Sequence, residues 1–506
     1  MKFFPTQAIK EIDRYTIDNE PVASIDLMER AARALASALL ERYAGRSFAL
    51  FCGPGNNGGD GLAVARMLHD AGCCAAAWLI NPKGKLSPDC AVNLKRLQET
   101  AVTVYEVNDS FIMPALGCGT VIVDALFGSG LNKPVCDGLF ACVIEAINAS
   151  ECEVVAVDMP SGLMGENNDP QHTTIVKADL TLTLQFPKMS LLFAENACNV
   201  GEMRILDIGL SQEGIEKIPS HLHFTGEKDI KSLLSPRAKH SHKGNFGRAL
   251  LVAGSKGMAG ASVLAARAAL RSGTGLLTVH VPGCNNDIVQ VAVPEAMTSI
   301  DSSECCFSDF VDTSKYSAVA VGPGLGQSKE SEKALLNLIG NCRAPMVLDA
   351  DALNILARNP EYMNRLPQGS VLTPHAGEFD RLFGAAEDTF ERLRKASAYA
   401  VESGVTVLLK GAHTVVIAPD GNLHFNSTGN PGMATGGSGD VLTGIILALL
   451  AQGYAADDVA RTAVYVHGLS GDYAAAEKGM TALVAGDIVD CLPSAWKYME
   501  RKEAVE

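Results

Sequence analysis

Short apolar runs, glycine-rich turns and amphipathic stretches alternate along almost the whole chain. Residues 25–43 carry apolar side chains at helical spacing, and the apolar run 48–52 leads directly into a glycine-rich loop. Short apolar runs flanked by turns predict buried strands, and their alternation with amphipathic stretches is typical of largely parallel sheets. The pattern therefore predicts an α/β protein.

One stretch interrupts this pattern. Residues 211–242 are rich in polar and charged side chains and contain Pro219 and Pro236. Strand-like runs lie on both sides of the stretch, at 48–52, 75–80, 121–123 and 154–157 before it and at 249–253, 277–281, 318–321, 346–348 and 370–372 after it. Each set is large enough for a sheet of its own, so we expect two domains, residues 1–215 and residues 225–506.

The charge balance narrows the range of partners. The 506 residues include 57 acidic and 42 basic side chains, a formal net charge of −15. This excess repels phosphate backbones and anionic lipids, so we expect small-molecule ligands and neither nucleic acid nor membrane as a partner. The most apolar stretch, 441–451, is too short to span a bilayer. The first fifteen residues form no secretory signal and the 14 cysteines include no C-x-x-C pair, so we expect a cytoplasmic protein with reduced thiols.

The first glycine-rich loop, residues 53–61, contains the spacing G-x-G-x-x-G between a strand and a helix. A Rossmann dinucleotide site also needs an acidic residue about twenty positions further on, where the next strand ends. That strand ends in Asn81, Pro82 and Lys83 instead. The standard mode of dinucleotide binding is therefore disfavoured.

Polar side chains nevertheless gather at three strand ends of the first half. Asn57 lies in the glycine loop, Asp124 and Asp158 end two further strands, and Ser161 follows in a small-residue loop. Open parallel sheets bind ligands outside the carboxyl ends of their strands, and oxygen ligands without Cys or His suit an alkali or alkaline-earth ion. The alternative is that these residues only form turns and helix caps.

Several motifs of this half resemble the N-terminal domain of the bifunctional NAD(P)H-hydrate repair enzymes. They are NNGGDG at 56–61, DALFGSGL at 124–131, DMPSG at 158–162, FPK at 186–188 and LDIGL at 206–210. The resemblance implies a Rossmann-like three-layer sandwich. It also implies an epimerase that interconverts the R and S forms of hydrated NADH and NADPH.

The same resemblance assigns site residues. It implies that Asn57, Asp124 and Ser161 hold a potassium ion, and that Asp158 is the catalytic acid or base, since epimerisation at this carbon needs proton transfer rather than a nucleophile. The residues implied to contact the hydrated nucleotide are Asn56, Asn57, Gly58, Gly59, Asp60, Gly128, Ser129, Gly130, Leu131, Asn132, Lys133, Pro134 and Asp158.

The second glycine-rich loop, residues 430–440, precedes the apolar helix expected at 441–450. Successive small residues before a helix expose backbone N–H groups, and the helix dipole adds positive potential, so an anion can bind there. Asp440 then lies beside the anion, where it could take a proton from a hydroxyl that attacks a phosphoryl group. The alternative is a glycine-rich turn in which Asp440 merely caps the helix.

The second half lacks the P-loop pattern and resembles the ribokinase superfamily, more closely its ADP/ATP-dependent NAD(P)H-hydrate dehydratase branch. The motifs that carry this resemblance are KGNFG at 243–247, GPGLG at 322–326, PHAGE at 374–378, KG at 410–411 and GGSGD at 436–440. It implies a ribokinase-like α/β fold. It also implies a lyase that phosphorylates the hydroxyl of the S hydrate from ADP with Mg²⁺ and then releases phosphate, giving AMP and NADH or NADPH.

The second resemblance assigns residues to two ligands. Those implied to contact the hydrated cofactor are Ala253, Gly324, His375 and the catalytic Asp440. Those implied to contact the nucleotide are Lys410, Gly411, Ala412, His413, Thr414, Asn430, Gly436, Gly437, Ser438 and Gly439. A homo-oligomer is expected.

Two other functions fit part of the sequence. The second half could be a ribokinase-like kinase for another small molecule, fused to an accessory binding domain. The first half could be a non-catalytic binding module. An epimerase partner makes sense only for a substrate with two epimers, and the presence of both Asp124 and Asp158 argues against a mere binding module. The sequence therefore predicts a bifunctional metabolite-repair enzyme.

Overall fold

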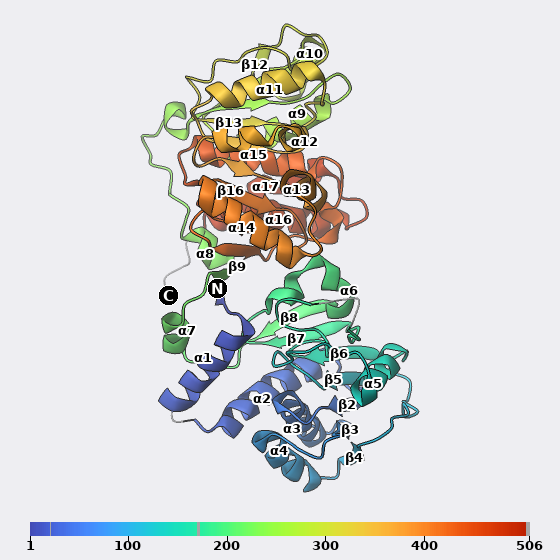
Figure 1. Cartoon of the computed structure of the whole chain (residues 1–506). Helices are drawn as coiled ribbons and strands as arrows, with labels where there is room; N and C mark the ends of the chain where they lie inside the picture. The colour runs from blue at the N-terminus through green and yellow to red at the C-terminus, as the bar shows by residue number, and fades with distance from the viewer. Residues whose placement is uncertain (21, 169–172, 502–506) are drawn as a thin grey trace. The chain divides into compact units, whose positions relative to one another are not determined.

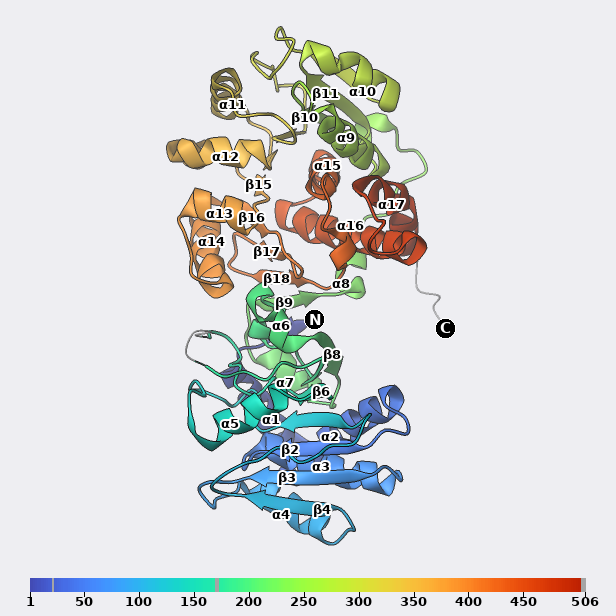
Figure 2. The ribbon, with the colours of Figure 1, turned by 90° about the vertical axis from the view of Figure 1, so that its right-hand side faces the viewer.

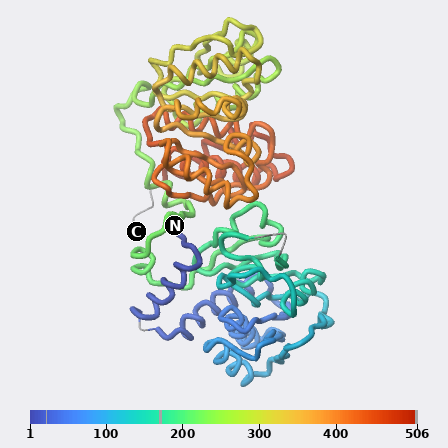
Figure 3. Tube along the Cα trace, viewed as in Figure 1, coloured from blue at the N-terminus to red at the C-terminus, as the bar shows by residue number. Residues whose placement is uncertain are grey.

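The computed structural model describes residues 1–20, 22–168 and 173–501. The chain forms two units, one of Lys2–Ser220 and the other of Met1 with His221–Glu506 (Figure 1). Figure 3 follows the backbone through them, from blue and green into green, yellow and red. Among the described residues, no helix combines the length and hydropathy needed to cross a bilayer. Both units alternate strands and helices, so the predicted α/β class is confirmed.

The first unit is built on a parallel sheet with the strand order β4-β3-β2-β5-β6-β7-β8. Every neighbouring pair in this order is parallel. The strands are β2 (Phe48–Cys52), β3 (Ala75–Ile80), β4 (Thr103–Val107), β5 (Val121–Ala125), β6 (Glu153–Val157), β7 (Leu180–Leu184) and β8 (Glu202–Leu206).

Helices cover both faces of this sheet, as Figure 2 shows from the side. Along β2, Leu50 packs into a core with α2 (Ser24–Arg42), α3 (Asn56–Asp70) and α4 (Pro88–Gln98). Its neighbour Phe51 points the other way and packs with α5 (Gly138–Asn148). Successive side chains of a strand thus pack into two cores on opposite faces of the sheet, and the unit is the expected three-layer sandwich.

The sequence pattern missed several elements around this sandwich. Helix α1 (Thr6–Asn19) buries only Ile9, Ile12 and Thr16, so its apolar stripe is too thin to stand out. The polar segment 211–242 also contains regular structure, because it forms α7 (Gln212–Lys217) in this unit and β9 (Leu222–Thr225) and α8 (Glu227–Lys231) in the second unit. The remaining short elements of the unit are β1 (Lys2–Phe3), α6 (Ala197–Val200) and the 3₁₀ turns Met189–Leu192 and Ala194–Asn196.

The second unit has the strand order β9-β18-β17-β16-β15-β14-β13-β10-β11-β12. Strands β16, β17 and β18 pair antiparallel, and the other pairs in this order are parallel. The strands are β10 (Arg248–Val252), β11 (Leu276–Val281), β12 (Met297–Ile300), β13 (Ala318–Val321), β14 (Met346–Leu348), β15 (Val371–Leu372), β16 (Thr406–Leu409), β17 (Val415–Ile417) and β18 (Leu423–Asn426).

This second sheet is also covered on both faces. One core joins it to α9 (Ala259–Arg271), α15 (Ser438–Ala451), α16 (Ala456–Lys478) and α17 (Ala485–Met499). The other joins it to α11 (Lys329–Asn341), α12 (Asp351–Arg358) and α13 (Ala376–Phe383). The remaining elements are α10 (Asn286–Ala292), α14 (Thr389–Ser403) and the 3₁₀ turns Lys243–Phe246, Gly283–Asn285, Pro360–Arg365 and Pro431–Met433.

Helix α15 differs from its predicted form in where it starts. It begins at Ser438 rather than Val441, so Asp440 lies inside its first turn. From Val441 to Ala451 the helix is buried all round, as its continuous apolar sequence requires. A Cβ on Gly444 would lie 2.2 Å from the carbonyl oxygen of Ala265 in α9. This glycine therefore lets the two helices pack with their backbones in contact.

Candidate active sites

In the first unit, three polar strand ends meet at one edge of the sheet. Strands β2, β5 and β6 are neighbours, and Asp124 lies beside Phe51 on one side and beside Ala156 on the other. The glycine loop after β2, the carboxylate of Asp124 and the carboxylate of Asp158 therefore share the carboxyl edge of the sheet. The structure brings together the groups that the strand pattern singled out.

Asp158 is held in a buried and fully bonded position. Its Oδ2 accepts a hydrogen bond from the backbone N–H of Ser129 at 2.9 Å, and its Oδ1 pairs with Nζ of Lys188. The Lys188 side chain is only 2% exposed and also donates to Thr183 Oγ1 and to the carbonyl of Leu184, both at 3.0 Å. Lys188 is thus a buried cation whose three N–H groups are all used.

These contacts determine the charge of Asp158. Burial acts to raise its pKa, but the ion pair with Lys188 and the hydrogen bonds from Ser129 outweigh burial and lower the pKa below its usual value. Asp158 is therefore a carboxylate near neutral pH and can accept a proton. Its backbone lies in the left-handed region at φ 65°, which is uncommon outside glycine.

Asp124 and Ser161 form a second buried pair beside it. Asp124 Oδ1 accepts from the Ser161 hydroxyl at 2.6 Å and Oδ2 from the Ser161 N–H at 2.7 Å. The Ser161 Oγ in turn accepts from the Phe127 N–H at 2.8 Å. Burial raises the pKa of Asp124 to about 6, although the bonds from Ser161 act against this rise. A cation near the pair would favour the ionised form.

Asn57 and Asp158 approach each other across the backbone of Gly128. A Cβ on Gly128 would lie 2.9 Å from Asn57 Oδ1 and equally close to Asp158 Oδ2. Among the described residues, the buried Asn57 Nδ2 finds no hydrogen-bond partner. Farther along the loop, Gly130, Asn132, Lys133 and Pro134 are exposed and Leu131 is half-buried.

The first turn of α3 contributes mainly backbone to this edge. Asn56 is exposed at its start, whereas Gly58 and Gly59 are buried. A Cβ on Gly58 would lie 1.7 Å from the carbonyl oxygen of Gly53, so only glycine lets the helix begin this close to the loop. Asp60 is buried, and burial followed by the charge of Asp158 raises its pKa well above the usual value.

A further carboxylate comes from α1, which the sequence pattern missed. Burial and the charge of Asp158 raise the pKa of Asp13 to about 6, and Lys188 acts against this rise. Helix α1 is held in place by Thr6, whose N–H and hydroxyl both donate to the carboxylate of Glu166, at 2.6 and 3.1 Å. Asp13 therefore lies within electrostatic reach of both charged groups of the site.

In the second unit, a pocket of about 810 Å³ lies at the start of α15. Of the residues assigned to ligands, Lys410, Gly411, Ala412, His413, Thr414, Asn430, Ser438, Gly439 and His375 line it. Gly436, Gly437, Asp440, Gly324 and Ala253 are not among its lining residues. The lining residues that no sequence motif pointed to include Asn426, Thr428, Val464 and His467.

A charged cluster lies directly beside this pocket. Lys410 Nζ pairs with Asp349 Oδ1 at 2.7 Å and lies 3.7 Å from Glu378 Oε2. Asp349, only 2% exposed at the end of β14, also accepts from the Thr443 hydroxyl of α15 at 2.8 Å. A Cβ on Gly439 would lie 3.5 Å from Asp349 Oδ2 and 3.6 Å from Lys410 Nζ. The glycine loop thus ends next to an ion pair between Lys410, which the motifs included, and Asp349, which they did not.

Asp440 belongs to the same cluster. Burial and the charge of Asp349 raise its pKa to about 7, and Lys410 acts against this rise. The helix cap is Gly437, with φ 92° and no side-chain cap bond. Within the described residues, no hydrogen bond ties the Asp440 carboxylate to the helix backbone. Asp440 therefore does not cap the helix, and a carboxyl group with this pKa is able to accept a proton near neutral pH.

His375 and Asn430 serve the local backbone as well as the pocket. His375 caps α13, because its Nδ1 accepts from the N–H groups of Gly377 and Glu378 at 3.0 and 3.3 Å. The Asn430 amide donates to Asp472 at 2.9 Å and its oxygen accepts from a backbone N–H. His375 still presents a side chain that is 53% exposed, whereas the Asn430 side chain is already bonded.

The two remaining assigned residues lie on adjacent strand ends. Ala253 follows β10, and Gly324 follows the neighbouring β13. The carbonyl of Gly324 accepts from the Ser255 hydroxyl at 2.9 Å, and its φ of 57° favours glycine. The structure therefore places both at the carboxyl edge of the sheet, where α/β sheets bind ligands.

The fold and these sites define a class, a two-domain α/β enzyme with one group of ionisable side chains at the edge of each sheet. A family profile described as NAD(P)H-hydrate dehydratase matches residues 249–494, and one described as YjeF-related protein N-terminus matches residues 24–190. The chain belongs to the family of bifunctional NAD(P)H-hydrate repair enzymes. The resemblance drawn from the motifs is thereby confirmed.

Relatives cover nearly the full length of the chain. The bifunctional NAD(P)H-hydrate repair enzyme Nnr of Moorella thermoacetica is 36% identical over 97% of this chain and 96% of its own. The enzyme of the same name from Thermofilum pendens is 36% identical over 99% and 97%. The solved ADP/ATP-dependent NAD(P)H-hydrate dehydratase of Bacillus subtilis, co-crystallised with ATP and Mg²⁺, is 33% identical over 55% of this chain and 99% of its own, with a TM-score of 0.49.

Proposed function

We propose that the first unit interconverts the R and S forms of hydrated NADH and NADPH, and that the second dehydrates the S form at the expense of ADP. The observation that carries the proposal is that each unit places one carboxylate, Asp158 or Asp440, at the carboxyl edge of its sheet with a lysine beside it. Family membership supports the pairing of the two activities in one chain.

In the first unit, Asp158 transfers the proton that epimerisation requires. Lys188 keeps it ionised and the Ser129 N–H fixes its second oxygen, so the carboxylate is ready to accept a proton. The hydrated ring is expected between the first turn of α3 and the loop 128–134. Asn57 of this turn and Gly128 of this loop both lie close to the Asp158 carboxylate.

A potassium ion fits the second group of this edge. Asp124, Ser161 and Asn57 supply oxygen ligands with a single formal charge, which suits a monovalent cation. Burial raises the pKa of Asp124 to about 6, which a cation bound beside it would lower again. Bound there, the ion would supply positive charge that favours ionised Asp124. Among the described residues, no group of three or more His, Cys, Asp or Glu side chains offers a transition-metal site instead.

In the second unit, Asp440 accepts the proton of the substrate hydroxyl. The hydroxyl oxygen bonds to the β-phosphorus of ADP as the bond to AMP breaks, and the N–H groups of residues 436–439 and Lys410 stabilise the transferred group. Phosphate then leaves with the substrate oxygen, and a proton leaves the neighbouring ring carbon. The products are NADH or NADPH, AMP and phosphate.

The nucleotide is expected in the pocket beside this base, held by the backbone of residues 410–414 and 436–439. Mg²⁺ would arrive with ADP and neutralise charge on its phosphate oxygens. Asp349 and Asp440 are the carboxylates on the glycine-loop side of the pocket, within reach of such an ion's charge.

Two variants test both halves of the proposal in one assay. Supplied with ADP and a mixture of R and S hydrates, Asp158→Asn should consume the S form and leave the R form. Asp440→Asn should restore no reduced-cofactor absorbance but should still equilibrate the two epimers. Normal consumption of both forms by Asp158→Asn, or normal dehydration by Asp440→Asn, would remove that residue from the mechanism.

Assembly and location stay predictions. A homo-oligomer is supported by β12, an edge strand of the second sheet that exposes Met297 and Ile300 to 48% and 57%. Exposed edge strands of this kind readily pair with another chain. Light scattering of the purified protein would measure the assembly directly. A cytoplasmic location is supported by the free state of the cysteines.

A further inference from the structure

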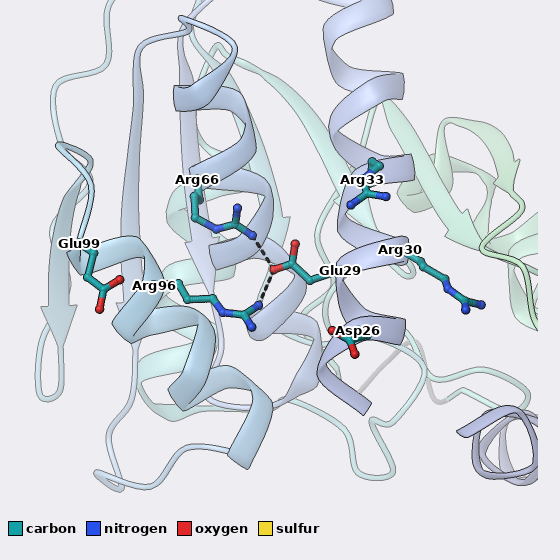
Figure 4. Close-up of a pocket in the computed structure, with 7 residues that line it drawn as sticks. All are labelled: Asp26, Glu29, Arg30, Arg33, Arg66, Arg96 and Glu99. Atoms are coloured by element: carbon teal, nitrogen blue, oxygen red, sulfur yellow. Dashed lines mark hydrogen bonds and ion pairs between the residues drawn. The ribbon is translucent and has the colours of Figure 1, made fainter. Parts of the chain in front are cut away.

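A pocket of about 600 Å³ lies on the helical face of the first unit, between α2, α3 and α4. Seven charged residues line it, as Figure 4 shows: Asp26, Glu29, Arg30, Arg33, Arg66, Arg96 and Glu99. Four of the seven are arginines, although the chain as a whole carries a net charge of −15. A local concentration of guanidinium groups in an acidic protein needs an explanation.

Ion pairs within the pocket explain only part of it. Arg66 and Arg96 reach from α3 and α4 to the same oxygen of Glu29, Oε1, at 2.5 and 2.8 Å (Figure 4). Arg30 points away from Glu29 in the same view and pairs with Glu20 at 3.1 Å. The two bonds to Glu29 link α2, α3 and α4, so part of the cluster stabilises the packing of these helices.

Two features remain after that function is accounted for. Arg33 is exposed on the pocket side of α2, and within the described residues it makes no hydrogen bond or ion pair. The Nε–H of Arg66 is buried and has no hydrogen-bond partner among those residues. A buried donor without an acceptor is costly, and a planar guanidinium with free N–H groups matches the oxygens of a phosphate.

We propose that this pocket is a second anion site, which binds a compact phosphate group through Arg33, Arg66 and Arg96. Glu29 is the carboxylate that holds the last two guanidinium groups in place and occupies part of the space that an anion would take. The four arginines of the lining exceed its three carboxylates by one positive charge. The phosphate group can be inorganic phosphate or part of a nucleotide.

The pocket shares its helices with the epimerase edge. Met28 is the neighbour of Glu29 on α2 and packs closely against Gly59 of α3. A Cβ on Gly59 would lie 2.9 Å from the Met28 sulfur. The Asn93 amide of α4 donates to both the Gly59 carbonyl, at 3.2 Å, and the Met28 sulfur, at 3.1 Å. An anion that draws Arg66 and Arg96 together therefore acts on the same three-helix contact that supports the first turn of α3.

Calorimetric titration of the full chain with inorganic phosphate, and separately with AMP, tests the proposal. Arg33→Gln should weaken phosphate binding about tenfold, because it removes a charged contact from a residue with no structural partner. Glu29→Gln should tighten binding, because it frees two guanidinium groups for the anion. Arg204→Gln is the matched control, since Arg204 is exposed and pairs with Glu41 outside the pocket.

The two titrants separate the possible sources of the phosphate. If free phosphate is the ligand, Arg33→Gln should weaken phosphate binding and leave AMP binding unchanged. If a nucleotide is the ligand, AMP should bind more tightly than phosphate and Arg33→Gln should weaken both. The proposal would be overturned if Arg33→Gln bound phosphate and AMP each as tightly as the unchanged chain does. It would also be overturned if Arg33→Gln and Arg204→Gln weakened binding equally. Both titrants are also products of the proposed dehydratase, so the binding that Arg33→Gln removes, and not the total binding, reports on this pocket.

Discussion

At the residue scale, the charge of each proposed catalytic carboxylate depends on the lysine beside it. Replacing Lys188 by Met leaves only the hydrogen bonds from Ser129 to oppose the burial of Asp158, so the pKa of Asp158 should rise. Since the proposed base works as a carboxylate, the acidic limb of the epimerisation pH profile should move to higher pH, by about 1–3 units. The pH dependence of kcat/KM for epimerisation measures this shift.

Lys177→Met is the control for that experiment, because Lys177 is exposed in the same unit. It should leave the pH profile unchanged. Dehydration of the S hydrate should be the same in both variants, since Asp440 lies in the other unit. A Lys188→Met profile that loses amplitude without moving would instead show that Lys188 only supports the fold.

The pKa of Asp440 differs from that of Asp158 in direction, because burial and the charge of Asp349 raise it to about 7. A base must be deprotonated, so dehydratase kcat/KM should rise with pH and level off above about 7. Asp440→Asn should lower kcat by about 10²–10⁴-fold. ADP binding, measured by calorimetry, should persist because its expected contacts lie at residues 410–414 and 436–439.

Thermal melting of the same variant separates a base from a structural residue. The raised pKa means that the folded state disfavours ionised Asp440, so this group lowers stability as pH rises above its unfolded pKa. Asp440→Asn should therefore melt at an equal or higher temperature at pH 8. A clearly lower melting temperature together with lost turnover would indicate a structural role.

At the scale of the element, the dehydratase edge depends on how closely α15 packs on α9. Gly444→Ala would place a Cβ 2.2 Å from the Ala265 carbonyl, and the backbone would have to shift. We expect a loss of about 1–3 kcal/mol in the free energy of unfolding of the second unit. Dehydratase activity should fall as Asp440 moves with the helix, whereas epimerisation should stay unchanged.

Gly340→Ala is the matched control at this scale. Gly340 lies in α11, is exposed, and a Cβ added there would meet nothing within 4 Å. The same change there should stabilise the helix by up to about 1 kcal/mol, because alanine has the higher helix propensity. Equal effects at positions 340 and 444, measured by thermal melting, would contradict the packing argument.

At the scale of the whole molecule, each unit has its own sheet and its own cores. We therefore expect a shortened chain that ends at Ser220 to keep epimerase activity, and one that starts at His221 to keep dehydratase activity. The second must not start later, because β9 begins at Leu222 and pairs with β18. Circular dichroism and the two assays on each shortened chain measure the outcome. Loss of both activities in both chains would show that the units depend on each other.

The sequence by itself determined the class of fold and the places where chemistry could occur. Strand runs such as 48–52 and glycine loops such as 53–61 are local patterns, and local spacing is enough to specify a buried strand followed by a tight turn. The same locality predicted α15, although its first turn starts at Ser438 instead of Val441. The sequence pattern did not predict helix α1, because the buried face of this helix holds few apolar residues.

Only the tertiary structure decided the partners and charges of the carboxylates. Lys188 is 30 positions from Asp158, Asp349 is 61 from Lys410, and the Thr443 hydroxyl that bonds Asp349 is 94 away. No local spacing relates such residues, because the order of the strands in the sheet brings them together. Burial, which sets the direction of each pKa, likewise depends on elements distant in sequence. The sequence could thus name Asp158 and Asp440, but only packing lowers the pKa of the first and raises that of the second to about 7.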